Sequence, residues 1–174
     1  MLLRLYKAKR ETVNKNSSKV DVFGIKYSVT NYSSASDLII GKAKVNASFG
    51  VSALAVHGLI ECYNNPSLKD TVNKIDLIVP DGQPVKWVMN NFYSLNLKDR
   101  VKGPQLTLEV LKKANIEKLS IYLYGSQKTT LNLFSENIYK WFPQIKIVGM
   151  HADRFRNATP EEDAADIEKI NKSG

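Results

Sequence analysis

One aspartate between a proline and a glycine is the residue best suited to acid–base chemistry in this sequence of 174 residues. Asp81 follows the apolar run DLIV (76–79), within the segment Pro80-Asp81-Gly82-Gln83-Pro84. A carboxylate on so stiff a turn, beside a helix start, can accept the proton of an attacking hydroxyl as a general base. The alternative is structural, because Asp81 can instead cap the helix that begins near Pro84. Spacing alone favours the cap.

Two other segments carry groups suited to phosphate. Asp99-Arg100-Val101-Lys102-Gly103-Pro104 precedes another helix start, and its two cations can hold a diphosphate, Arg100 through a bidentate fork. Gly125-Ser126-Gln127 follows the apolar run SIYLY, and glycine there lets backbone N–H groups approach a phosphate at a helix N-terminus. A solvated loop and a simple strand-to-helix turn are the respective alternatives. The glycine turn lacks both the GxGxxG and the GxxxxGK[ST] pattern.

A histidine follows another strand-length run, FGVSALAV (49–56). A lone histidine such as His57 is more typical of a hydrogen-bonded structural residue than of a catalyst. The sequence has no DxD, HExxH or CxxC motif and a single cysteine, Cys62. It therefore predicts neither a divalent-metal site nor a metal cofactor.

The elements that must position these residues alternate between strands and helices. The expected strands are two short pieces within 20–30 broken at Gly24, then 49–56, 76–79, 120–125 and 145–150. The runs at 49–56 and 120–125 are uninterrupted apolar stretches, as expected of strands buried on both faces. Between these strands, apolar residues recur at helical spacing, which predicts helices there. This alternation predicts an α/β fold with an open, mainly parallel sheet and helices on both faces.

Several helix starts carry capping signals. Thr159-Pro160-Glu161-Glu162 combines an N-cap, a proline at the first helical position and acids in the first turn. Asn31, Ser33 and Ser34 can each cap the helix that follows them, and Ser67 is the expected cap after Pro66. The helix at 129–142 carries an apolar stripe of Leu131, Phe134, Ile138 and Trp141.

Charge separates a basic N-terminal segment from the rest. The chain has 25 Lys and Arg against 17 Asp and Glu, a net charge of +8, and residues 1–20 alone contribute +5. We expect a basic, flexible segment at 1–19 and one domain at 20–174. The segment is either a solvated end or is attracted to anionic lipid, whereas no motif indicates nucleic acid. The longest uncharged stretch, 45–60, is too short to span a bilayer. The single cysteine suits a reducing cytoplasm, so we expect a cytoplasmic protein, peripheral at the inner face of the membrane.

The segments together resemble one family. VSALAVHG, NKIDLIVPDGQPVKW, DRVKGPQL, IYLYGS and FPQIKIVG occur in the order and spacing of the WecB/TagA/CpsF glycosyltransferases, from about Val20 to Gly174. The resemblance implies a Rossmann-like fold. It also implies an inverting transferase that moves an N-acetylmannosamine-like sugar from a UDP-sugar to a lipid-linked or exopolysaccharide acceptor. It makes Asp81 the catalytic base and Arg100 a phosphate ligand, and it matches Gly125 and Ser126 to the family's glycine turn. The expected substrate-binding residues also include Gly82, Gln83, Gly103 and His57.

The sequence departs from the family in two places. Many members have Thr-x-Asn where this chain has Ala53-Leu54-Ala55, so the usual substrate-binding hydroxyl and amide are absent, and Ser52 or His57 can substitute for them. This difference favours an exopolysaccharide acceptor over wall teichoic acid. The family also continues beyond the position of Gly174 with a strand and a basic, membrane-associating tail. We therefore expect a C-terminally incomplete domain that transfers little sugar and associates with itself through an exposed sheet edge. The alternative is a non-catalytic, Rossmann-like nucleotide-binding module or an inactive remnant.

Overall fold

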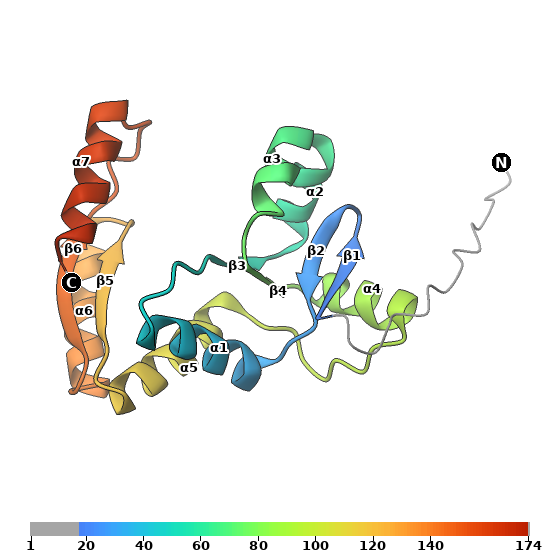
Figure 1. Cartoon of the computed structure of the whole chain (residues 1–174), viewed down its shortest axis with the longest axis horizontal. Helices are drawn as coiled ribbons and strands as arrows, with labels where there is room; N and C mark the ends of the chain where they lie inside the picture. The colour runs from blue at the N-terminus through green and yellow to red at the C-terminus, as the bar shows by residue number, and fades with distance from the viewer. Residues whose placement is uncertain (1–17, 174) are drawn as a thin grey trace, which may run out of the picture. The chain divides into compact units, whose positions relative to one another are not determined.

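A computed structural model describes residues 18–173, which form two compact units. Unit 1 covers 18–109 and unit 2 covers 110–173. Each unit contains one pair of parallel strands flanked by helices (Figure 1). The α/β class predicted from the sequence is confirmed.

Unit 1 combines an antiparallel hairpin, a parallel strand pair and helices. Its elements are β1 (Lys19–Val22), β2 (Ile25–Ser28), α1 (Tyr32–Lys44), β3 (Val51–Leu54), α2 (Val56–Asn64), α3 (Pro66–Val72), β4 (Leu77–Pro80), α4 (Gln83–Tyr93) and the first half of α5 (Gly103–Ile116). β1 pairs with β2 across the turn at Phe23-Gly24, and β3 pairs with β4 so that Ser52 lies opposite Ile78.

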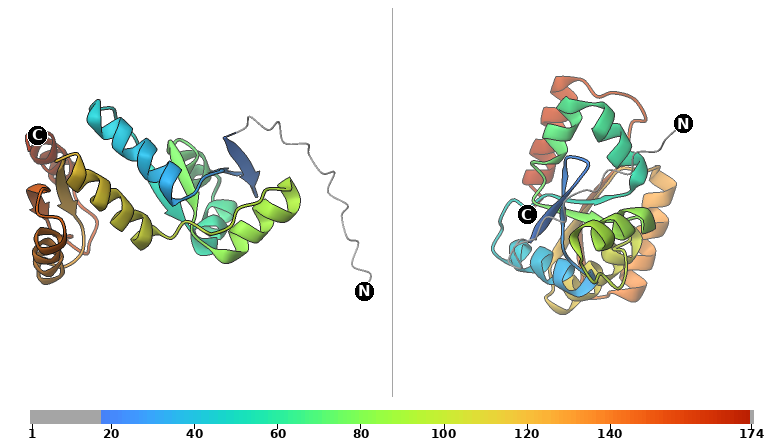
Figure 2. Two further views of the ribbon diagram at one scale, coloured as in Figure 1. Left: turned by 90° about the horizontal axis from the view of Figure 1, so that it is seen from below. Right: turned by 90° about the vertical axis from the view of Figure 1, so that its right-hand side faces the viewer.

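The core of unit 1 lies between the hairpin, β4, α2 and α4, and Figure 2 shows α4 beside the hairpin. Its buried members are Val20, Val22, Ile25, Tyr27, Leu59, Cys62, Ile78, Val85 and Met89. Polar contacts fasten the hairpin to its neighbours: the Tyr27 hydroxyl donates to the carbonyl of Leu54 at 3.2 Å, and the Asn73 amide donates to the carbonyl of Gly24 at 2.8 Å. The hairpin is therefore an integral layer of unit 1.

Unit 2 contains the second half of α5 and four further elements. These are β5 (Ser120–Tyr124), α6 (Lys128–Trp141), β6 (Lys146–His151) and α7 (Pro160–Asn171). β5 and β6 run parallel, with a register shift between Ile121 and Tyr122. A Cβ on Gly149 would lie 2.3 Å from the ring of Tyr122, so only glycine allows this close contact across the pair.

Local capping signals correctly identified the cap of α7 and included the cap of α1, but they missed the cap of α3. The Thr159 side chain accepts from the backbone N–H of Glu162 in a capping box, as predicted. Of the three candidates before α1, Asn31 is the cap. The prediction for Ser67 is wrong: Asn65 caps α3, because its side chain accepts from the N–H of Leu68 at 3.1 Å.

Burial along the strands and in α6 departs from the prediction. β4 is buried at all four positions, but β3 alternates between exposed and half-buried residues, and β5 is at most half-buried. The prediction that 49–56 and 120–125 are buried on both faces is therefore wrong. In α6, Leu131 and Ile138 are buried as expected. Trp141, however, is 55% exposed, because the helix ends at this residue and Phe142 turns inward instead.

Candidate functional site

The turn after β4 places Asp81 at the carboxyl end of a buried strand. Its N–H donates to the carbonyl of Leu54 at 3.4 Å, which continues the parallel pairing by one residue. Gly82 is the N-cap of α4, and no side chain caps that helix. The structural alternative, in which Asp81 caps the helix near Pro84, is therefore wrong.

The Asp81 carboxylate instead faces the start of α5. Its Oδ2 accepts from the backbone N–H of Gly103 at 3.2 Å. A Cβ on Gly103 would lie 3.3 Å from the Cβ of Ala53 and 3.7 Å from Oδ2, so glycine permits this approach. Among the described residues, Oδ1 has no hydrogen-bond partner, and Asp81 is only half-buried. One carboxylate oxygen is thus anchored while the other is available to a ligand.

A pocket of about 530 Å³ lies next to this turn. It is lined by Tyr32, Gln83, Asp99, Arg100, Lys102 and Gln105. The structure therefore brings two predicted residues, Gln83 and Arg100, into one pocket, and the Gly103 contact connects its rim to Asp81. With two cations against one carboxylate, the lining suits a phosphate group.

A second pocket, of about 440 Å³, shares Tyr32 and Asp99 with the first. Its other lining residues are Val29, Thr30, Asn31, Asn96, Leu97 and Lys98. Hydroxyl and amide groups predominate among its polar side chains, which suits an uncharged polar ligand. The two pockets together have the size of an ordinary small-molecule site.

Two residues proposed to replace the missing Thr-x-Asn lie on either side of the β3–α2 junction. Ser52 is half-buried in β3, and His57 is exposed in the first turn of α2. The His57 side chain forms no hydrogen bond with any residue in 18–173, so the structure shows none of the contacts that the structural interpretation requires. Gly58 packs tightly, since a Cβ there would lie 2.6 Å from Leu54 Cδ1.

The predicted glycine turn belongs to unit 2. Gly125 and Ser126 have φ angles of +105° and +59°, and the turn is bonded to the loop after β6. The N–H of Gly125 donates to the carbonyl of His151, and the carbonyl of Ser126 accepts from the N–H of Asp153, both at 2.9 Å. No side chain caps the start of α6. That these two residues share a site with Asp81 remains a prediction.

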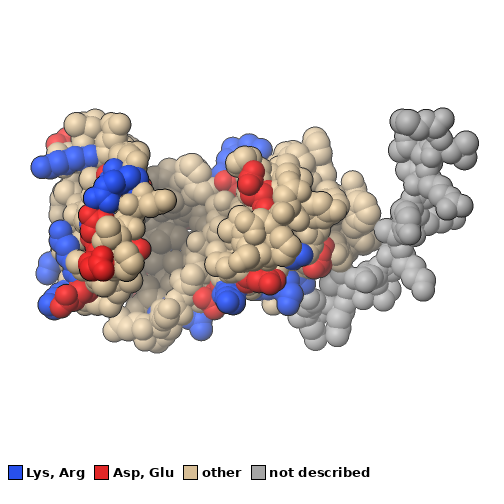
Figure 3. All heavy atoms as spheres, turned by 90° about the horizontal axis from the view of Figure 1, so that it is seen from above, with Lys and Arg blue, Asp and Glu red and all other residues tan. Residues whose placement is uncertain are grey.

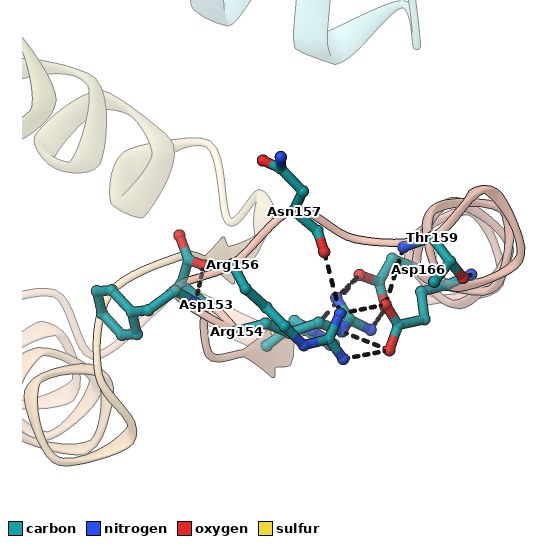
Figure 4. Close-up of polar contacts among 9 residues, drawn as sticks. Asp153, Arg154, Arg156, Asn157, Thr159 and Asp166 are labelled. Atoms are coloured by element: carbon teal, nitrogen blue, oxygen red, sulfur yellow. Dashed lines mark hydrogen bonds and ion pairs between the residues drawn. The ribbon is translucent and has the colours of Figure 1, made fainter.

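An ion-pair network in unit 2 was not predicted. Arg154 donates twice to the Asp166 carboxylate, at 2.5 and 3.0 Å, and Arg156 donates twice to Glu162, at 2.7 and 2.8 Å. Figure 4 shows both guanidinium groups directed at α7. The one sequence signal for this network is a pair of arginines after a strand, followed by acids four residues apart on the next helix.

The network lowers the basicity of its carboxylates. The hydrogen bond from Arg154 holds the pKa of Asp166 below its usual range, and the hydrogen bonds from Arg156 lower the pKa of Glu162 to about 2. On the left-hand part of Figure 3, acidic and basic side chains of unit 2 accordingly lie next to one another. These acids stabilise the loop before α7 and are poorly suited to accept a proton.

Two sequence expectations concern membranes and metals. The basic segment at 1–19, expected to contact lipid, lies almost wholly outside the described residues. Within the described range, no helix combines the length and the apolar character needed to cross a membrane. The same range contains no group of three His, Cys, Asp or Glu residues close enough to hold a metal ion.

Residues 20–174 match the family described as Glycosyl transferase WecG/TagA/CpsF family. The chain is 28% identical over 111 residues to an N-acetylglucosaminyldiphosphoundecaprenol N-acetyl-beta-D-mannosaminyltransferase of Bacillus spizizenii, covering 58% of this chain and 43% of the relative. It is 32% identical over 80 residues to a protein of the same name from Bacillus subtilis, covering 46% of this chain and 31% of the relative. The matched regions thus span less than half the length of either relative.

Proposed function

The chain belongs to the WecG/TagA/CpsF family of glycosyl transferases, and on that premise we propose that it transfers an N-acetylmannosamine-like sugar from a UDP-sugar to a lipid-linked acceptor. The relatives' names specify N-acetylglucosamine on undecaprenyl diphosphate as acceptor and a β-linked mannosaminyl product. Single displacement on an α-linked UDP-sugar would give that β-linkage with inversion, and it requires one general base.

Asp81 is the proposed base. Its unbonded Oδ1 takes the proton of the acceptor hydroxyl while the hydroxyl oxygen attacks the anomeric carbon of the donor. The bond from that carbon to UDP breaks, and UDP leaves with the electron pair. The Gly103 N–H holds Oδ2, which keeps the carboxylate in one orientation throughout the step.

Arg100 and Lys102 are proposed to bind diphosphate. Both line the pocket beside the Asp81 turn, and neither has an ion-pair partner among the described residues. Their charge offsets that of the donor or acceptor diphosphate, with Arg100 able to bind two oxygens at once. One observation carries the proposal: at the end of β4, a carboxylate oxygen without a hydrogen-bond partner in 18–173 lies close to a cationic pocket.

A matched pair of asparagine variants tests the role of Asp81. Asp76 stands at the opposite end of β4 and also accepts one backbone N–H, that of Gly50 at 2.8 Å. We expect Asp81→Asn to reduce sugar transfer about 10²-fold or more, and Asp76→Asn to leave it within about threefold. The assay measures transfer from UDP-N-acetylmannosamine to a lipid-linked N-acetylglucosamine diphosphate. Equal loss in both variants would contradict the proposal.

The same assay on the wild-type chain distinguishes a transferase from a protein that only binds nucleotide. UDP-sugar binding without any transfer to an acceptor would instead support the non-catalytic nucleotide-binding module. Because Ala53-Leu54-Ala55 replaces the usual Thr-x-Asn, the assay should compare several lipid-linked glycans, including exopolysaccharide precursors. We propose that such acceptors bring the protein to the inner face of the cytoplasmic membrane as a peripheral protein, which vesicle flotation with and without the acceptor lipid would test.

A further inference from the structure

The segment that carries Arg100 is fastened by three successive backbone N–H groups, each to a different acceptor. Val101 donates to the carbonyl of Pro80 at 2.9 Å, Lys102 donates to the hydroxyl of Tyr32 at 3.0 Å, and Gly103 donates to Oδ2 of Asp81 at 3.2 Å. These bonds connect the segment to the end of β4, to α1 and to the proposed base. Of the three bonds, the one to Tyr32 joins the residues farthest apart in sequence, 70 positions.

Tyr32 is itself held firmly. It is the first residue of α1, directly after the N-cap Asn31, whose side chain accepts from the N–H of Ser34 at 3.0 Å. The carbonyl of Tyr32 accepts from the hydroxyl of Ser36 at 2.7 Å. The half-buried Tyr32 lines both pockets. The capped helix start therefore fixes the backbone of Tyr32, and from this position the phenol hydroxyl accepts from the N–H of Lys102.

Arg100 depends on this backbone for its position. The Arg100 side chain makes no hydrogen bond or ion pair with any residue in the described part of the chain. The guanidinium is thus placed by the conformation of its own segment. Val101 is fully buried, which fixes the backbone on the N-terminal side of Lys102. The Tyr32 hydroxyl adds a restraint on the next N–H group, that of Lys102.

We propose that Tyr32 is a positioning residue for anion binding: its hydroxyl fixes the 101–103 backbone and thereby holds Arg100 ready for a diphosphate. This inference rests on the proposed function, in which Arg100 binds diphosphate. Loss of the hydroxyl leaves the Lys102 N–H without its acceptor while removing no ring atom. The segment then samples more conformations, and the cost of ordering it is added to ligand binding.

Hydrogen exchange tests the structural half without any ligand. Tyr32→Phe is expected to speed exchange of the Lys102 amide at least tenfold and to affect its neighbours at 101 and 103 less. The matched control is Tyr93→Phe, which removes another tyrosine hydroxyl bonded to the backbone, in this case one that donates to the carbonyl of Asp21. Tyr93 lies in the same unit but lines neither pocket. Unchanged exchange at Lys102 in Tyr32→Phe would overturn the inference.

Titration with inorganic pyrophosphate tests the functional half. We expect Tyr32→Phe to weaken pyrophosphate binding roughly tenfold and Tyr93→Phe to leave it unchanged. In the Arg100→Ala background, Tyr32→Phe should cause no further loss, because Tyr32 acts through Arg100. Additive losses, or equal binding by Tyr32→Phe and wild type, would overturn the inference. A third outcome separates the two proposals. If the wild type does not bind pyrophosphate but Lys102 still exchanges faster in Tyr32→Phe, the phosphate role of Arg100 is contradicted and the restraint by Tyr32 is not.

Discussion

Asp81 in unit 1 and Asp166 in unit 2 differ in the number and charge of the groups that donate hydrogen bonds to their carboxylates. Asp81 in unit 1 accepts a single neutral backbone N–H and keeps its second oxygen without a partner among the described residues. Asp166 in unit 2 is 8% exposed and has both oxygens bonded to Arg154. A carboxylate held by one amide can still accept a proton, whereas one that forms a bidentate pair with arginine is held in its charged form. The number and charge of the donors therefore separate a candidate base from a structural acid.

The two units also differ in how deeply their strands are buried. Unit 1 buries a contiguous cluster in which β4 has no exposed position. In unit 2, β5 and β6 are at most half-buried, and the loop between β6 and α7 is held by ion pairs. Apolar packing thus positions Asp81, while polar contacts position the loop of unit 2. Each of the following predictions tests one side of this contrast.

The largest expected effect is on the free energy of unfolding of unit 1. Ile78→Ala in β4 should cost about 2–5 kcal/mol, because Ile78 is 0% exposed and its removal leaves a cavity. The matched change in unit 2, Ile147→Ala in β6, should cost about 1 kcal/mol or less, since Ile147 is only half-buried. Urea unfolding of both variants measures the difference. Equal losses would show that unit 2 depends on apolar packing as much as unit 1.

Acid should selectively weaken unit 2. The folded-state pKa of Glu162 is about 2, below its ordinary value of 4.5, because Arg156 donates to the carboxylate. This pair therefore stabilises the fold fully above about pH 4.5, and the contribution is lost as pH falls toward 2. We expect Glu162→Gln to lower the melting temperature at pH 6 and to match wild type near pH 2.

The control for this acid effect is Asp163→Asn, on the same turn of α7. Its side chain has no ion pair within the described range, so its melting curve should follow wild type at each pH. A wild-type advantage over Glu162→Gln that persists undiminished at pH 2 would refute the role given to the ion pair.

A smaller effect, on sugar transfer, is expected from a substitution at Gly103, where α5 approaches Asp81. Gly103→Ala adds a Cβ 3.3 Å from Ala53, so the segment must move away from β3 and weaken the bond to Asp81. We expect transfer to fall about tenfold while the melting temperature changes little, since alanine favours a helix by about 1 kcal/mol. Gly41→Ala in α1 is the control, because a Cβ there meets no atom within 4 Å. Full transfer by Gly103→Ala would show that activity does not depend on the close approach of Gly103 to Asp81.

The smallest effect concerns one buried hydroxyl in each unit. Ser28 Oγ in unit 1 and the Tyr122 hydroxyl in unit 2 have no hydrogen-bond partner among the described residues. Because a buried polar group without a partner is destabilising, Ser28→Ala should raise the free energy of unfolding by about 1 kcal/mol. Tyr122→Phe should raise it less, since Tyr122 is only half-buried and relaxes more easily toward water. Calorimetry would detect both shifts, and destabilisation by Ser28→Ala would reveal a hydrogen bond to the hydroxyl.

Signals that act within a few residues could be predicted from the sequence. The α/β class, the cap at Thr159, the helix after Gly82 and the strand at 76–79 all follow from spacing, turn residues and apolar patterns. The position of Asp81 after a buried strand follows in the same way. The cap and the helix start depend on contacts between residues close together in the chain. The strands and the α/β class are indicated by patterns that a single sequence displays directly.

Only the tertiary structure decided which groups meet across long separations. Sequence spacing favoured Asp81 as a cap for α4, yet its carboxylate bonds to Gly103, and Lys102 bonds to Tyr32, a residue that no motif marks. The sequence likewise indicated a buried strand at 49–56, whereas β3 is partly exposed, because burial depends on what packs against a strand as well as on its own residues. Such partners are chosen by packing of whole elements, and a periodic pattern describes only one face of one element at a time.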